Sequence, residues 1–183
     1  MSDFFVNLGR KPLARKMIQT LGLPVPMPQY LARGGGPWTE RFLKGETVVV
    51  GHLPGAGLAQ VLATSLCNTG ATLFVEGSEA QYECYTAQGE ASLVNGDGLP
   101  EGTRPRALVF DATDIEDAQD LRKVNAFFHG LIKRVAPCGR MIVLSRPPSD
   151  YEKPELAAAA RALEGFARSM AREAGRKGTT AQI

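Results

Sequence analysis

The stretch TVVVGHLPGAG, residues 47–57, decides the fold of this chain. Its first four residues form a continuous apolar run, which is typical of a strand buried in a parallel sheet, and its glycines permit a sharp turn. The stretch LAQVLATSLCNTG, residues 58–70, then repeats apolar side chains at helical spacing and ends on a glycine suited to a helix C-terminus. The sequence therefore predicts a strand, a glycine turn and a helix in direct succession.

The same alternation continues to the end of the chain. Further strands are expected in ATLFVEG (71–77), RALVFDA (106–112), GRMIVLS (139–145) and TTAQI (179–183), and helices at 118–135 and 154–174. A short helix at 79–88 is also expected, while ASLV (91–94) fits either a poor strand or a loop. Apolar strands separated by helices predict an α/β fold, a doubly wound parallel sheet of the Rossmann or flavodoxin-like type.

The first 45 residues differ from the rest, because five prolines and a run of three glycines interrupt any long regular element. A short helix fits residues 12–21, and LPVPMPQY (23–30) favours extended chain. We interpret residues 1–45 as a Pro/Gly-rich arm that covers a sheet edge or a neighbouring domain. Residues 46–183 then form the Rossmann-like domain.

Composition excludes several classes of protein. The 183 residues contain 44% hydrophobic and 22% charged residues, as an ordinary globular domain does. The 21 basic residues barely outnumber the 19 acidic ones and form no run interleaved with aromatics, which argues against nucleic-acid binding. Three cysteines without a CxxC spacing argue against a disulfide framework and a zinc site. No stretch resembles a signal peptide or a membrane span, so a cytoplasmic location is expected.

The glycine turn is a candidate nucleotide site. Gly51, Gly55 and Gly57 would let a pyrophosphate approach the N-terminus of the following helix, and Glu76 could bind an adenosine ribose, which favours NAD. Pro54 removes one backbone donor from the turn, however, and no Lys or Arg lies there. The simpler interpretation is that the glycines only allow a sharp turn and close packing, so that any nucleotide site is vestigial.

Other polar residues offer weaker candidates. His52 has no evident partner, and a histidine in a loop is most simply solvated. Asp111 ends a strand and is followed by three more carboxylates, which makes a Mg²⁺ site conceivable. We favour the alternative that one of these carboxylates, at position 114 or nearby, caps the next helix. No metal is therefore expected.

Three segments resemble the short-chain dehydrogenase/reductase family over residues 46–183. GHLPGAG has that family's glycine spacing, GRMIVLS looks like its serine-bearing strand, and RALEGFARSMAREAG is similar to its helix after the catalytic tyrosine and lysine. The whole chain, with GLPVPMPQY, LVFDAT and RVAPCGRMIVLSRPP, resembles more closely the N-terminal half of the high-molecular-weight bacterial 3-oxoacyl-ACP reductases.

The resemblance also implies that the catalytic residues are missing. Leu156 stands where the family has its tyrosine, Ala160 where it has its lysine, and Arg146 where it has its serine, with Ser145 one residue early. FDAT (110–113) replaces the family's NNAG turn. The nearby Tyr151, Lys153 and Arg161 are most simply solvated residues of a helix, and no catalytic residue is assigned to this chain.

This resemblance implies a non-catalytic domain in an NADH-dependent reductase of 3-oxoacyl thioesters, with acyl carrier protein or coenzyme A as carrier. The domain would support folding, dimerisation or the substrate channel of a ketoreductase domain later in the same polypeptide, so the chain is expected to continue beyond Ile183. A homodimer is expected. A stand-alone module that binds NAD or another adenine nucleotide is the alternative, and an active reductase using Tyr151 is a third.

Overall fold

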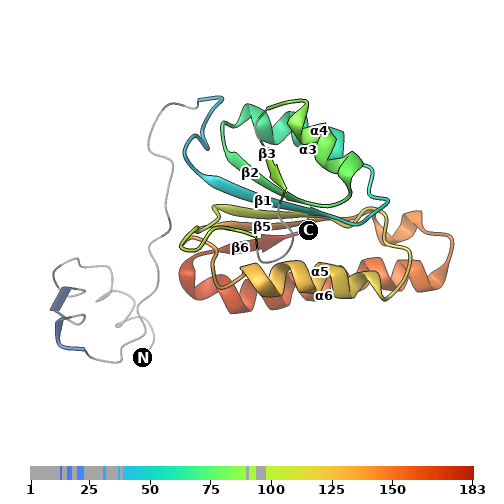
Figure 1. The fold of residues 1–183 in the computed structure, drawn as a ribbon. Helices are drawn as coiled ribbons and strands as arrows, with labels where there is room; N and C mark the ends of the chain where they lie inside the picture. Colours follow the sequence, from blue (N-terminus) through green and yellow to red (C-terminus); the bar gives the residue numbers. More distant parts are fainter. Residues whose placement is uncertain are drawn as a thin grey trace.

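The structure is a computed structural model, in which most of the chain from Thr39 onward is described (Figure 1). The described residues are 13, 16, 17, 20–22, 31, 37, 39–89, 91–93 (backbone only) and 98–183. The strands are β1 (Thr47–His52), β2 (Thr72–Glu76), β3 (Ala91–Leu93), β4 (Ala107–Asp111), β5 (Arg140–Leu144) and β6 (Thr180–Gln182). The helices are α3 (Ala59–Asn68), α4 (Glu79–Thr86), α5 (Asp120–Leu131) and α6 (Pro154–Ala174). The interpretation of the arm falls largely outside the described residues and stays a prediction.

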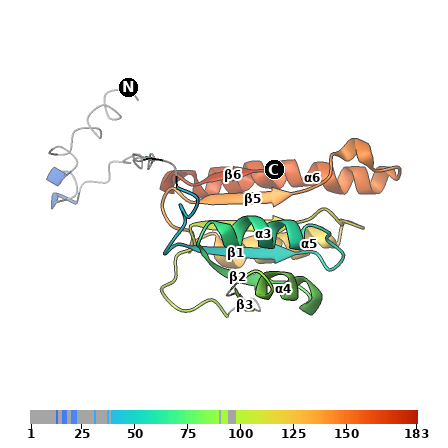
Figure 2. The same cartoon turned by 90° about the horizontal axis from the view of Figure 1, so that it is seen from above.

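The six strands form one parallel sheet in the order β3-β2-β1-β4-β5-β6 (Figure 2). Strand β1 pairs with β2 on one side and with β4 on the other, so the order of strands reverses beside it. Open α/β folds place their ligands beyond the carboxyl ends of the strands at such a reversal. The glycine turn follows β1 directly and therefore lies at this place.

Helices cover both faces of the sheet: α3 and α4 lie on one face, and α5 and α6 on the other (Figure 1). The core on the α5 and α6 side is the larger and contains four phenylalanines whose rings contact one another. The smaller core, beneath α3 and α4, combines the valines of β1, β2 and β4 with alanines of α3 and Tyr85 of α4. This arrangement confirms the doubly wound α/β fold.

The two faces of β5 are covered unequally. Met141 and Val143 point towards α5 and α6 and are completely buried. Ile142 and Leu144 point to the opposite face and stay partly exposed, because no helix of the described chain lies over β5 there. The sheet therefore keeps a partly open apolar surface beside α3.

Some expected elements differ in extent. The helix expected at 118–135 is shorter: α5 ends at Leu131, and the four residues after it form turns that lead to Pro137. Asp117 stabilises its start, because the Asp117 carboxylate accepts hydrogen bonds from the backbone N–H groups of Gln119 and Asp120. The ambiguous ASLV segment contains the short strand β3.

No disulfide joins Cys67, Cys84 and Cys138, all of which lie in the described part of the chain. Among the described residues, no helix combines the length and the apolarity needed to cross a membrane.

Candidate functional site

The three glycines of the motif have different surroundings: Gly51 lies within β1, and Gly55 and Gly57 lie in the turn that follows. A β-carbon at Gly51 would lie 2.6 Å from the ring of Phe110 and 2.7 Å from that of Phe127, so this glycine allows the sheet and α5 to pack closely. A β-carbon at Gly57 would meet no atom within 4 Å. None of the three glycines adopts a left-handed backbone. Gly51 therefore has a packing role, whereas Gly57 is open to solvent.

The third glycine, Gly55, is covered by a carboxylate. A side chain here would overlap Asp114, whose carboxylate lies directly against the glycine backbone. Asp114 is held from the other side by Arg146, whose Nη2 lies 3.8 Å from Asp114 Oδ1. In a dinucleotide site the space beside this glycine would receive a phosphate. Here it holds a negative charge that belongs to the chain itself.

A second carboxylate occupies the N-terminus of α3. Asp111, the last residue of β4, accepts a hydrogen bond from the backbone N–H of Leu58 at 3.0 Å, just before α3 begins. It also accepts bonds from the backbone N–H and the hydroxyl of Thr113, at 3.1 and 2.6 Å. The free N–H groups at a helix N-terminus are what binds phosphate in nucleotide folds. Asp111 already accepts a hydrogen bond from one of these N–H groups, that of Leu58.

Asp111 also belongs to a buried chain of polar side chains. The Nδ1 of His52 lies 3.5 Å from Asp111 Oδ2, and its Nε2 lies 2.8 Å from the Tyr85 hydroxyl. Neither His52 nor Asp111 has any exposed side-chain surface. The expectation of a solvated His52 without a partner is therefore wrong. These groups are buried, so no substrate can reach them. The Tyr85–His52–Asp111 chain instead has a structural role: it joins α4, β1 and β4 and stabilises the turn.

The pKa values agree with this assignment. Burial alone would raise the pKa of Asp111, but the His52 ring beside it and the hydrogen bonds from Thr113 and Leu58 outweigh burial and hold the pKa below its ordinary value. Burial, followed by the nearby Asp111 carboxylate, raises the pKa of Tyr85 far above its usual range. Tyr85 thus stays protonated, so its hydroxyl can donate a hydrogen bond to His52 Nε2, while Asp111 stays ionised.

Gln81 fixes the turn from α4. Its Nε2 donates to the backbone carbonyls of Leu53 at 2.8 Å and Ala56 at 3.3 Å, and the side chain is buried. Its Oε1 accepts from the backbone N–H of Ser78, which completes a capping box at the start of α4. Hydrogen bonds from within the chain therefore hold the turn against α4.

Glu76 ends β2 as the sequence predicts, beside the turn. It is partly buried, burial raises its pKa, and it makes no hydrogen bond or ion pair with any described residue. A ribose could still be bound here, since a carboxylate without a partner accepts hydroxyl protons. Glu76 thus has no partner within the described chain, while the carboxylates of Asp111 and Asp114 lie at the glycine turn.

The positions aligned with the family's catalytic residues hold no proton donor. Leu156 is half-buried, Ala160 is buried, and both lie on α6. Tyr151 is not a solvated helix residue as expected: it precedes α6, packs against the larger core and has a buried hydroxyl without a hydrogen-bond partner of good geometry among the described residues. Burial raises its pKa, which makes proton release harder. Lys153 and Arg161 are exposed, as expected.

The carboxylates after β4 act within the chain. Asp117 caps α5 as described above, and Asp114 pairs with Arg146. No group of three or more histidine, cysteine, aspartate or glutamate side chains within the described ranges has the geometry of a metal site. These contacts account for the carboxylates of Asp114 and Asp117.

No family model and no curated protein sequence matches the chain. Solved structures do match. A short-chain dehydrogenase/reductase from Serratia marcescens is 16% identical, with a TM-score of 0.59 over 76% of this chain and 72% of that one. A double variant of a Serratia marcescens short-chain dehydrogenase/reductase is 19% identical, with a TM-score of 0.58 over 76% and 73% of the two chains. At this level of identity the likeness shows a shared fold.

Proposed function

We propose that this chain is a non-catalytic Rossmann-like domain that works as part of an NADH-dependent 3-oxoacyl-thioester reductase. It would support the folding, the homodimer or the substrate channel of a ketoreductase domain in the same polypeptide, and it would bind no dinucleotide itself. The fold shared with short-chain dehydrogenase/reductases supports the reductase context. The sequence resemblance supplies the 3-oxoacyl thioester, on acyl carrier protein or coenzyme A.

One observation supports the non-catalytic role: two carboxylates lie at the glycine turn, the part of a nucleotide-binding fold that receives phosphate. Asp111 already accepts the N–H at the start of α3, and Asp114 lies against Gly55. A pyrophosphate would have to displace both groups or lie within a few ångströms of their charges. At that separation, like charges repel by about 1 kcal/mol in water and by more in a partly buried site.

The experiment is a calorimetric titration of the folded chain with NADH and NAD. We expect no saturable binding up to millimolar cofactor in the wild type. An Asp111→Asn/Asp114→Asn variant should bind measurably more tightly, because both repelling charges are gone while the amide oxygen introduced at position 111 can still accept the Leu58 N–H. Glu116→Gln/Asp150→Asn removes the same charge from exposed residues at the same edge and serves as the control. Micromolar binding by the wild type would contradict the proposal.

A second candidate function is supported by Glu76. This carboxylate is partly buried, has no partner in the described chain and ends β2 beside the glycine turn, a position from which an acidic residue can bind a ribose. A module that binds an adenine nucleoside or nucleotide would therefore lose affinity in Glu76→Gln, and it would show saturable binding in the same titration. NADH oxidation with a 3-oxoacyl-CoA by this chain alone would contradict both candidates.

A further inference from the structure

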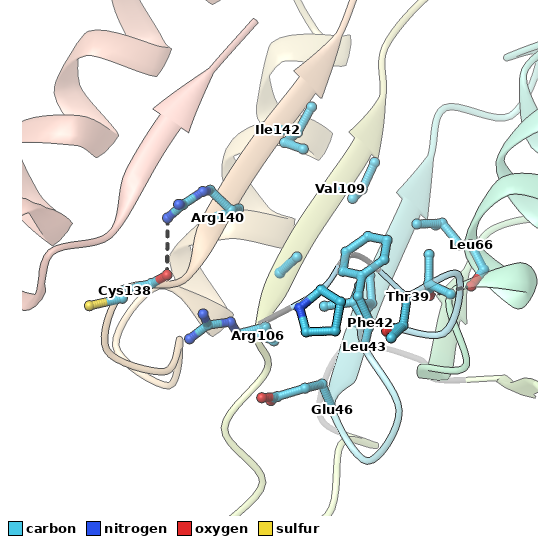
Figure 3. Close-up of a pocket in the computed structure, with 14 residues that line it drawn as sticks. Thr39, Phe42, Leu43, Glu46, Leu66, Arg106, Val109, Cys138, Arg140 and Ile142 are labelled. Atoms are coloured by element: carbon cyan, nitrogen blue, oxygen red, sulfur yellow. Dashed lines mark hydrogen bonds between the residues drawn. The ribbon is translucent and has the colours of Figure 1, made fainter. Parts of the chain in front are cut away.

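The edge of the sheet opposite the glycine turn carries a surface that the proposed function does not use. An apolar hollow of about 580 Å³ lies on the partly open face of the sheet, between α3 and β5 (Figure 3). Val109 and Ile142 project into it from neighbouring strands, where they are register partners, and Leu66 and Phe42 line its other wall. The lining is mainly apolar, as is common where a hydrophobic side chain of a partner is bound.

One end of this hollow is basic. Arg106 and Arg140 line it at the amino ends of β4 and β5, and Glu46 is the one carboxylate among its lining residues. A second hollow of about 390 Å³ at the same edge is lined by four further cations and no carboxylate: Arg104, Lys133, Arg134 and Lys177. None of these six cations forms an ion pair with a described carboxylate.

Backbone carbonyls hold several of these cations in place. Arg140 Nη1 donates to the carbonyls of Cys138 and Gly139, both at 3.0 Å, and Arg106 Nη1 donates to that of Pro137 at 3.2 Å. Lys177 Nζ donates to the carbonyl of Lys133. Carbonyls fix the direction of a side chain but leave its charge uncompensated. The basic end is therefore ordered in advance, which reduces the entropy lost on binding a partner.

Helix electrostatics explain only part of this charge. Lys133 and Arg134 follow the last residue of α5, where cations favour the negative end of the helix. Arg106 and Arg140 lie at the starts of strands instead, and a strand has no comparable end charge. Their position beside an apolar hollow matches the composition of protein interfaces, in which arginine and aromatic residues are enriched.

We infer that this edge is a docking surface for an acidic amphipathic helix of a protein partner, with its apolar side chains in the hollow and its carboxylates on the arginines. The apolar lining disfavours a duplex nucleic acid or another uniform polyanion, because neither exposes a hydrophobic face to bury. A helix in a hydrophobic groove combines the two kinds of contact that this surface offers. The inference does not rest on the proposed function, since the surface lies at the other end of the strands.

The probe is a fluorescein-labelled peptide of about 18 residues, or five helical turns, with leucines on one face and glutamates on the other. Fluorescence anisotropy with the full chain should show saturable binding that weakens as salt rises, because salt screens the charges. Two comparison peptides carry lysine in place of glutamate, or serine in place of leucine. Both should bind at least about tenfold more weakly, because each lacks one of the two complementary features.

Variants locate the binding. Arg140→Glu should weaken the acidic peptide about tenfold, because it places like charges opposite each other. If Arg140→Glu fails to fold, Arg104→Glu gives the same test. The Arg104 side chain is exposed and makes no hydrogen bond or ion pair in the described chain, so its replacement should leave the fold intact. Arg122→Glu, near the other end of α5, makes the same change in net charge and should leave binding unaltered.

Four results would overturn the inference: no saturable binding of the acidic peptide, equal binding of the serine or lysine peptide, equal loss of affinity in Arg122→Glu, or displacement of the peptide by heparin at equal charge. The last result would show a surface that binds any polyanion. Circular dichroism of each variant keeps unfolding separate from loss of binding.

Discussion

Gly51 and Gly57 belong to one motif, but a side chain would have opposite effects at the two positions. Gly51→Ala places a methyl group against Phe110 and Phe127, and we expect it to lower the free energy of unfolding by about 1–3 kcal/mol. Gly57→Ala enters open space on a backbone that any residue adopts, and should change stability by less than about 1 kcal/mol. Urea unfolding of both variants measures the difference, and equal losses would show that the packing account of Gly51 is wrong.

Asp111 makes stability depend on pH in a predictable direction. The pKa of Asp111 is lower in the folded chain than in the unfolded one. Its ionised form therefore stabilises the fold at pH values above the ordinary pKa of 3.8. That contribution is lost as the pH falls below 3.8 and through the folded pKa. We expect the stability difference between the wild type and Asp111→Asn to shrink over this range in acid titrations of urea unfolding. The exposed Asp150→Asn should show no such trend, and a difference independent of pH would contradict the assignment.

The sequence predicts the glycine turn but not what fills it. The spacing of Gly51, Gly55 and Gly57 predicts a sharp turn between a strand and a helix, and the structure has one there. The contacts of His52 with Asp111 and Tyr85 join residues far apart in the chain, and only the pairing of β1 with β4 and the packing of α4 bring them together. The residues next to His52 in the sequence therefore could not reveal its partners.

At the scale of elements, strand length and position in the sheet predict how fast backbone amides exchange. β1, β4 and β5 pair on both sides, whereas β3 and β6 are three residues long and pair on one side only. We expect amide hydrogens of β3 and β6 to exchange with solvent first and those of β4 last, because edge strands open at little cost. Hydrogen exchange followed by mass spectrometry tests this, and equal protection of β6 and β4 would contradict it.

Most elements were predictable, including the short helix α4 and the short strand β6, and the exceptions are the end of α5 and the strand β3. The helix α6 has the bounds that its proline at the start and glycine after its end predict. The helix α5 is shorter than its apolar stripe, because Ile132 and Val135 are buried from turns rather than from helix. β3 was ambiguous because three residues carry no clear period, and its pairing with β2 supplies the missing information.

At the scale of the molecule, the fold class follows from the order of elements, because apolar strands that alternate with helices have few arrangements open to them. The sequence does not show which sheet face stays partly open beside α3, since that depends on where the helices lie. The basic surface at the amino ends of the strands was missed for the same reason. Its cations are dispersed along the sequence, and only the parallel sheet gathers them at one edge.

The place of β1 in the sheet has a consequence for synthesis on the ribosome. β1 can pair with β2 soon after both emerge, but its other edge has no neighbour until β4 follows, since Val48 pairs with Ala107. Throughout that interval a nascent chain exposes an apolar strand edge, which is a template for aggregation. Chaperones that bind nascent apolar segments therefore have their target in the middle of the finished sheet, on a strand that the native fold buries almost completely.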